Sequence, residues 1–101
     1  MPYQKTLKLK ISASAKSDLI DIAQYTFTNY GKQQVDTYLQ TLYDAMELLT
    51  KNPKIGHSRN DISEGYEILN VESHLLIFKA NDENMTIARI LHKRQDIKQL
   101  F

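Results

Sequence analysis

Hydrophobic and polar residues follow two different periods along this chain, and each period predicts a different kind of element. Leu7, Leu9 and Ile11 alternate with Lys8 and Lys10, and this period of two is typical of a strand with one solvated face. From residue 15 to residue 49 the apolar positions recur every three or four residues, which predicts helices. The chain therefore begins with a strand over residues 6–12 and continues with a helical region.

The helical region divides at Gly31, which is placed to end the first helix in a left-handed conformation. Ser12 or Ser14 can cap the start of that helix, and the second helix ends at Asn52 because the residue before Pro53 resists the helical conformation. With so short a connection, the two helices should form an antiparallel hairpin. The stripe residues, which we interpret as core, are Ala15, Leu19, Ile22, Ala23 and Thr26 or Phe27 in the first helix, and Val35, Tyr38, Leu39, Leu42, Met46 and Leu49 in the second. We expect half-buried packing for Tyr25, Tyr30, Tyr38 and Tyr43, and a solvated helix face for Asp18 and Asp21.

The second half of the chain predicts three strands. Residues 54–65 carry two glycines and clustered polar residues, so they form a surface loop, and residues 66–71 form a short strand. Residues 75–78 are apolar throughout, which is typical of a central strand covered on both faces, and residues 81–84 are a turn that joins it to a strand over residues 85–91 as an antiparallel hairpin. In a short helical turn over residues 96–101, Ile97 and Leu100 or Phe101 are expected to pack back. The predicted order is β-α-α-β-β-β, an α+β fold in which an N-terminal helical hairpin packs on a mainly antiparallel sheet.

Composition places the chain among small soluble proteins and removes several kinds of chemistry. Its 101 residues fit a single domain over residues 1–101, and hydrophobic and charged contents of 42% and 25% are ordinary. The chain has no cysteine, which excludes disulfides, thiol catalysis and thiolate metal sites. A formal net charge of +1 does not predict attraction to nucleic acid, so we expect no direct nucleic-acid binding. Nothing resembles a secretory signal or the ~20-residue apolar run that crosses a bilayer, so we expect a cytoplasmic protein without a membrane partner.

Common ligand-binding and catalytic motifs are missing from the sequence. His57, His74 and His92 lie far apart, with no helical His pair and no carboxylate at ligand spacing, so we expect no metal site. Residues 56–58 lack the second glycine of a nucleophile elbow, and no glycine-rich phosphate loop or dinucleotide fingerprint occurs. We therefore expect no cofactor.

Positive charge gathers where the last predicted strand ends. Residues 89–98 include four Lys or Arg residues and one acid. Cleavage of RNA by its own 2′-OH needs a base, an acid and cations around the phosphate, and the chain has such a set. Its members are His92, Arg89, Arg94, Arg59 and Lys54.

Each of these residues also has a structural interpretation, because any basic sheet surface supplies a similar set. His92 can simply close a strand edge. Arg89 interrupts an apolar strand, so it must reach solvent or find a partner, and a structural ion pair with Glu67 or Glu72 on a neighbouring strand would provide one.

Ordered motifs over nearly the whole chain resemble the ParE toxins of type II toxin–antitoxin modules, within the RelE/ParE superfamily. The most specific of them is the end of the last strand, Arg89-Ile90-Leu91-His92, followed by a basic residue and an Asp. The other matching segments are Ala15 with Asp18-Leu19 and Ile22, Tyr30-Gly31, Asn52-Pro53 with Gly56, Glu64-Gly65-Tyr66, and His74-Leu75-Leu76-Ile77-Phe78. The chain departs from many members at Gln95, Lys79 and Tyr30, and these departures bear on target preference and not on the fold.

The resemblance implies a toxin that poisons DNA gyrase, blocks replication and is held inactive by a cognate antitoxin, ParD-like or similar, in a hetero-oligomer. We expect a protein inhibitor and not an enzyme, with target-binding residues Arg89, His92, Lys93 and Arg94. An apolar antitoxin segment is expected to cover the helical hairpin at Tyr25, Tyr38, Leu42 and Tyr43. Two alternatives stay open: a ribosome-dependent mRNA endonuclease of RelE type that uses His92, and a non-toxic homologue that only binds antitoxin.

Overall fold

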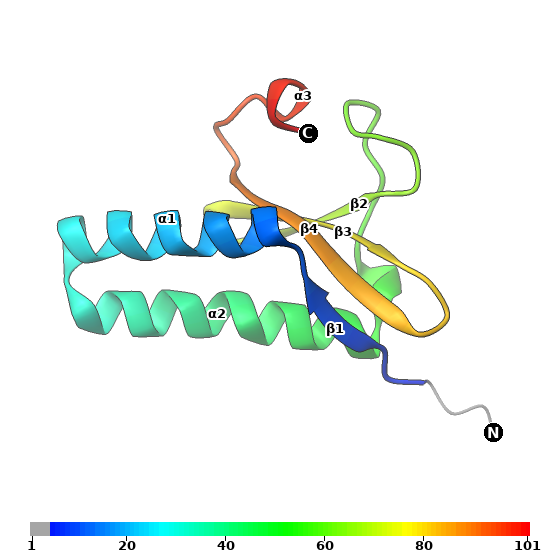
Figure 1. Ribbon diagram of the computed structural model, residues 1–101, viewed down its shortest axis with the longest axis horizontal. Coiled ribbons are helices and arrows are strands. Elements are labelled where there is room, and N and C mark those ends of the chain that lie inside the picture. The colour runs from blue at the N-terminus through cyan, green and yellow to red at the C-terminus, as the bar shows by residue number, and fades with distance from the viewer. Residues whose placement is uncertain (1–4) are drawn as a thin grey trace.

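Two long helices and a four-stranded sheet make up the fold (Figure 1). The computed structural model describes residues 5–101, and within this range the side chains of Gln99 and Leu100 lie outside the described part. In chain order the elements are β1 (Lys8–Ile11), α1 (Ala13–Tyr30), α2 (Lys32–Lys51), a 3₁₀ turn (Pro53–Ile55), β2 (Glu67–Val71), β3 (His74–Ala80), β4 (Asn84–His92) and α3 (Ile97–Leu100). This order confirms the predicted α+β fold. Within residues 5–101, no helix combines the length and the apolar character that crossing a bilayer requires.

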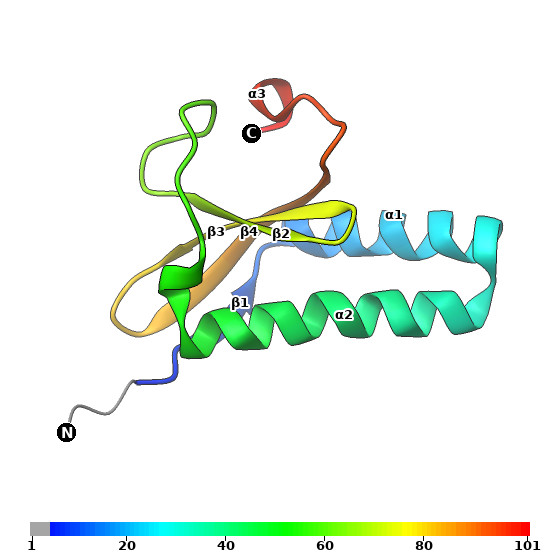
Figure 2. The same cartoon turned by 180° about the vertical axis from the view of Figure 1, so that it is seen from behind.

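The sheet has the strand order β1-β4-β3-β2. β2 with β3 and β3 with β4 pair antiparallel, whereas β1 pairs parallel with β4. A parallel pair needs a long crossover connection between its two strands, and the α1–α2 hairpin forms part of that connection. The hairpin packs on one face of the sheet (Figures 1 and 2). The predicted central strand is confirmed, because β3 lies between β4 and β2 and its residues 75–78 are all buried.

Helix α1 begins and ends at residues that the sequence singled out. Ser12 is the N-cap, with its hydroxyl oxygen accepting a hydrogen bond from the Ala15 N–H at 3.0 Å, so the choice between Ser12 and Ser14 is settled for Ser12. Gly31 ends the helix with φ 88° and ψ 177°, so the expected left-handed helical conformation was wrong in ψ. This region of positive φ is accessible mainly to glycine, and it lets α2 begin at the next residue.

Both faces of the sheet are covered by apolar side chains. Leu76, Phe78 and residues of β4 pack against the helical hairpin in the larger core. Leu75 and Ile77, one residue out of phase on β3, belong to a smaller core on the opposite face. The side chains that cover this second face are Ile62, Tyr66, Ile97 and Phe101, with the Tyr66 and Phe101 rings 4.7 Å apart edge to face. The predicted packing of Ile97 and Phe101 is therefore confirmed, and the side chain of Leu100 lies outside the described residues.

The helical hairpin extends well beyond the sheet, at the end where α1 meets α2 (Figures 1 and 2). Tyr25 and Tyr30, in the second half of α1, are 66% and 68% exposed. Tyr43 is also exposed, so the expectation of half-buried packing was wrong for these three tyrosines and correct only for Tyr38. The helical spacing predicted which residues face α2 and the sheet, but the sheet is too short to cover the far end of the hairpin.

Candidate functional site

A groove of about 590 Å³ lies where the overhanging helices meet the far end of the sheet. Tyr25 of α1 and Tyr38 of α2 contribute to its walls, and Tyr30 lines it near the helix connection. His74 from the start of β3 and His92 from the end of β4 line the opposite side. We call this hollow the aromatic groove.

Tyr38 and His74 form a hydrogen-bonded pair inside the aromatic groove. The Tyr38 hydroxyl and His74 Nδ1 are 2.6 Å apart, and the Ser73 N–H donates to the same hydroxyl at 3.3 Å. Burial raises the pKa of Tyr38, which keeps the phenol protonated and able to donate to Nδ1. Burial, together with repulsion from His92, lowers the pKa of His74 from 6.5 to about 4, so this ring is neutral at pH 7. When the Tyr38 hydroxyl donates to Nδ1 of the neutral ring, the hydrogen of His74 lies on Nε2.

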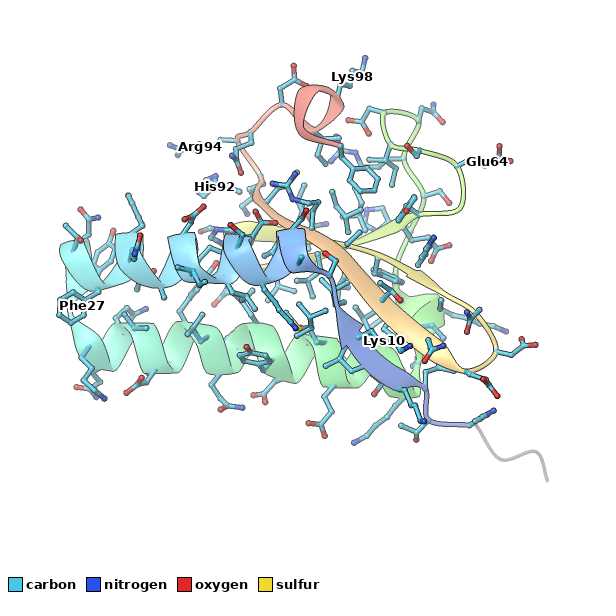
Figure 3. All side chains as sticks on the ribbon, viewed as in Figure 1. Lys10, Phe27, Glu64, His92, Arg94 and Lys98 are labelled. Atoms are coloured by element: carbon cyan, nitrogen blue, oxygen red, sulfur yellow. The ribbon has the colours of Figure 1, made fainter. Side chains whose placement is uncertain are left out.

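His92 lies beside His74, with the two ring centroids 5.2 Å apart. The ring Nδ1 of His92 accepts a hydrogen bond from the backbone N–H of Arg94 at 3.1 Å. The backbone N–H of His92 donates to the side-chain oxygen of Gln95 at 2.7 Å. These two bonds fix the turn that follows β4, and neither of them involves the ring Nε2 of His92. The side chains of His92 and Arg94 lie above α1 in Figure 3. Lys93 and Arg94 are both exposed, and together with His92 we call them the basic corner.

Arg89, expected to bind the target, is held inside the fold by Asp18 of α1. Its Nε and one terminal nitrogen donate to the two carboxylate oxygens at 2.9 and 3.0 Å, and the Ile90 N–H donates to the same carboxylate at 2.8 Å. The side chains of Arg89 and Asp18 are only 23% and 11% exposed. The hydrogen bonds to Asp18 raise the pKa of Arg89 further above its ordinary value.

This arrangement corrects three expectations. Arg89 does not belong to the exposed basic corner, its ion-pair partner is neither Glu67 nor Glu72, and Asp18 is not on a solvated helix face. The reason lies in the sheet, because β1 pairs with β4 only as far as Ile87. Beyond that point α1 runs along the edge of β4, and the Asp18 carboxylate accepts the N–H that a neighbouring strand would otherwise bind.

The residues expected to bind antitoxin do not form one surface. Tyr25 and Tyr38 both line the aromatic groove. Leu42 is completely buried in the larger core, so its place in a contact surface was wrong. Its position on the apolar stripe of α2 directs it toward the sheet, where it has no free surface to offer. Tyr43 is exposed one residue further along α2.

Of the cations in the RNA-cleavage scheme, Arg94 lies next to His92, and the other three lie elsewhere. Arg59 pairs with Asp61 in the loop before β2 through a two-point ion pair. Lys54 lines a different hollow, beside Phe78 and Ala80. Among residues 5–101, no group of three or more His, Asp or Glu side chains is arranged to hold a metal ion.

Sequence and structure comparisons point to one family. The family described as the ParE toxin of the type II toxin–antitoxin system parDE matches residues 9–97. The protein named Toxin ParE1 from Mycobacterium tuberculosis is 32% identical over 88 residues, covering 86% of this chain and 90% of that protein. Toxin ParE1 from Caulobacter vibrioides is 26% identical over 89 residues, covering 88% of this chain and 92% of that protein.

Solved structures with the same fold include chains from two different systems. A chain of the chromosomal ParDE system of P. aeruginosa superposes with a TM-score of 0.76 at 20% identity, covering 87% of this chain and 97% of that chain. A chain of the E. coli DinJ–YafQ complex superposes with a TM-score of 0.61 at 20% identity, covering 87% and 94%. At these identities the likeness establishes the fold alone.

Proposed function

Because the chain belongs to the ParE toxin family of type II toxin–antitoxin systems, we propose that it arrests growth by inhibiting DNA gyrase and that a cognate antitoxin neutralises it by direct binding. In this proposal residues 1–101 act as one toxin domain in the cytoplasm, without a cofactor. The match of the family over residues 9–97 is the observation that carries the toxin assignment. The proposed target and the proposed mode of neutralisation rest on the aromatic groove and the basic corner.

The aromatic groove is the surface that suits the antitoxin. Exposed aromatic side chains beside half-buried ones form an apolar hollow with polar edges, which is the usual make-up of a protein-binding surface. Tyr25 and Tyr30 have their faces open to a partner, and Tyr38 forms part of the wall behind them. An apolar antitoxin segment with hydrophobic anchors would bury these rings. Leu42 takes no part in this contact.

The basic corner is the surface that suits gyrase or the DNA next to it. Lys93 and Arg94 are exposed at a turn that is fixed by the hydrogen bonds of His92. Arginine and lysine at a rigid turn can form charge-assisted hydrogen bonds with an acidic partner surface, each contributing roughly 1.5–3 kcal/mol where solvent is excluded. Arg89 supports this corner indirectly, since its ion pair with Asp18 holds the end of β4 against α1.

The two surfaces share His92, and this overlap explains neutralisation. His92 lines the aromatic groove, and it is also a member of the basic corner. An antitoxin segment that fills the groove would therefore cover part of the surface offered to the target. Neutralisation would then follow from competition for one site, without a change in the toxin fold.

A ribosome-dependent mRNA endonuclease is the rival function, and the neighbouring His74 and His92 rings are the observation that favours it. Two points argue against it. Arg89 is engaged by Asp18, and Arg59 is engaged by Asp61, so neither is presented as a phosphate-binding cation in this conformation. A nuclease would need several cations beside its base to stabilise the charge that develops on the phosphate, and of the cations in this scheme Arg94 is the exposed one next to His92.

Two assays separate the candidate functions. Purified toxin is added to gyrase in a DNA supercoiling assay, where we expect supercoiling to stop and cleaved DNA to accumulate. In parallel, primer extension on mRNA from expressing cells reports codon-phased cuts if the protein is a nuclease. Unimpeded supercoiling at excess toxin together with mRNA cuts would establish the rival, and unimpeded supercoiling with no cuts and no growth arrest would indicate a non-toxic homologue that only binds antitoxin.

A further inference from the structure

A second apolar surface runs along α1, on a different side of the helix from the aromatic groove. Ile20 and Phe27 are each 59% exposed, and they are seven residues apart, so they lie on the same side of the helix after two turns. Tyr25 is two residues from Phe27, which places it about 200° away around the helix. The two surfaces can therefore be occupied independently.

The second surface contains a hollow beside a projecting ring. The hollow has a volume of about 650 Å³ and is lined by residues of both helices, including Ala23, Phe27 and Val35. Phe27 lies at the far end of the hairpin in Figure 3. A large exposed ring next to a shallow apolar hollow has the shape of a knob beside a hole. We call Ile20, Ala23, Phe27 and Val35, with the rim residues Lys32 and Asp36, the outer patch.

The charges of the outer patch are balanced. Lys32 and Asp36 both line the hollow and form a solvent-exposed ion pair at 2.9 Å on one face of α2. The patch therefore presents one cation, one anion and an apolar centre. A strongly acidic or strongly basic partner finds no net attraction here. A surface of this kind is complementary to itself, because a two-fold axis brings the cation of one copy to the anion of the other.

From this geometry we propose that the outer patch binds a second copy of this chain in a two-fold symmetric dimer. Phe27 of each copy inserts into the hollow of its partner, as a knob enters a hole between two helices. Lys32 of each copy exchanges its own Asp36 for Asp36 of the partner. The aromatic groove and the basic corner stay open in this dimer, so each copy keeps its surfaces for antitoxin and target.

Sedimentation velocity of the full-length chain over a range of concentrations tests the dimer. We expect a concentration-dependent shift from monomer to dimer in the unchanged protein. Phe27→Asp should weaken association at least 10-fold. Leu48→Asp is the matched control, because Leu48 is an exposed apolar residue on α2 outside the outer patch, and it should leave association unchanged.

Two charge variants test the arrangement itself. Lys32→Asp and Asp36→Lys should each weaken self-association by about 10-fold, because each places like charges opposite one another across the two-fold axis. An equimolar mixture of the two variants should recover dimers, since every opposed pair is then of opposite sign. A protein that stays monomeric at all concentrations, dimers that survive Phe27→Asp, or a mixture that associates no better than either variant alone would overturn the proposal. Growth arrest and gyrase inhibition are separate readouts, so failure of the dimer leaves the proposed function untouched.

Discussion

Asp18 and Arg89 are 71 residues apart in the chain, and their two-point ion pair joins the first helix to the last strand. The same Asp18 carboxylate accepts the Ile90 N–H, so one side chain satisfies both a guanidinium and a strand edge. The Ser12 hydroxyl donates to the Ala88 carbonyl oxygen at 2.7 Å a short way along the same edge. The start of α1 therefore takes the place of a strand where β1 ends.

Removing the Asp18 carboxylate should destabilise the fold. In Asp18→Ala a largely buried guanidinium and a backbone N–H both lose the carboxylate oxygens of Asp18 that accept from them, and we expect a loss of about 2–4 kcal/mol in the free energy of unfolding. Urea denaturation measures it. Asp21→Ala is the control, because Asp21 is exposed on the next turn of α1 and should change stability by less than about 0.5 kcal/mol. Equal effects of the two substitutions would show that the ion pair contributes nothing.

Stability should also depend on the protonation of His74. Its pKa falls from 6.5 to about 4 in the folded state, because burial and His92 disfavour the charged ring. A folded pKa below the unfolded value means that the unfolded chain binds more protons between these two pH values. The contribution of neutral His74 to the free energy of unfolding is therefore fully present above pH 6.5 and is lost as the pH falls toward 4. After allowance for partial solvent exposure, this contribution amounts to roughly 2–3 kcal/mol.

The measurement compares urea denaturation of the unchanged protein and of His74→Gln at several pH values from 7.5 to 4. Carboxylates titrate in the same range, so the difference between the two proteins isolates the histidine. The unchanged protein should lose more stability on acidification than the variant. Parallel pH profiles would mean that His74 titrates normally in the folded state.

Gly56 should not tolerate a side chain. A Cβ built there would lie 2.3 Å from Cζ and 2.7 Å from Cε1 of the Phe78 ring, which is buried in the larger core. Gly56→Ala should therefore cost about 1–3 kcal/mol, as overpacking of a core does. The same substitution combined with Phe78→Leu should cost less than the sum of the two single changes, because the shorter side chain removes the clash. If the costs of the two substitutions in the free energy of unfolding simply add, the strain in Gly56→Ala does not come from the Phe78 ring.

The elements could be predicted from the sequence because each has a local cause. The alternation in residues 7–11, the helical stripes and the turn at residues 81–84 depend only on neighbouring residues, and the structure has all of them. The Asp18–Arg89 pair depends instead on where β1 ends and how α1 crosses β4. Nothing in the local pattern records that, so the sequence alone suggests Glu67 or Glu72 as partners. In the structure β3 separates the strand of Glu67 from β4, and Glu72 lies in the turn after that strand.

The pairing of His74 with His92 shows a second limit. Counting back from the turn, Ala80 opposes Met85, and a regular ladder would place His74 opposite Leu91. A β-bulge between Ile77 and Phe78 shifts the register by one residue, so His74 opposes His92. The residue pattern predicts the strands but not the bulge, and the bulge brings the two rings together in the aromatic groove.

Antitoxin binding should separate exposed from buried members of the helical hairpin. Tyr25→Ala removes an exposed ring from the aromatic groove, and we expect it to weaken antitoxin affinity at least 10-fold with little loss of stability. Leu42→Ala should do the opposite, with a loss of about 2–5 kcal/mol in folding and no direct change in affinity for the folded protein. Calorimetric titration with antitoxin and urea denaturation measure the two quantities. Strong antitoxin binding by Tyr25→Ala would move the contact away from the groove.

Arg94→Glu tests whether target and antitoxin compete for one corner of the molecule. Arg94 is exposed and donates its backbone N–H to His92, which the substitution leaves in place, so the turn should keep its shape while its charge is reversed. We expect gyrase inhibition to fall at least 10-fold and antitoxin affinity to fall as well, with both losses smaller at high salt because exposed charges are screened. Lys98→Glu is the control, since Lys98 is an exposed cation on α3 outside the aromatic groove. If Arg94→Glu abolishes gyrase inhibition but binds antitoxin at full strength, the two partners use separate surfaces, and neutralisation must work by something other than direct competition.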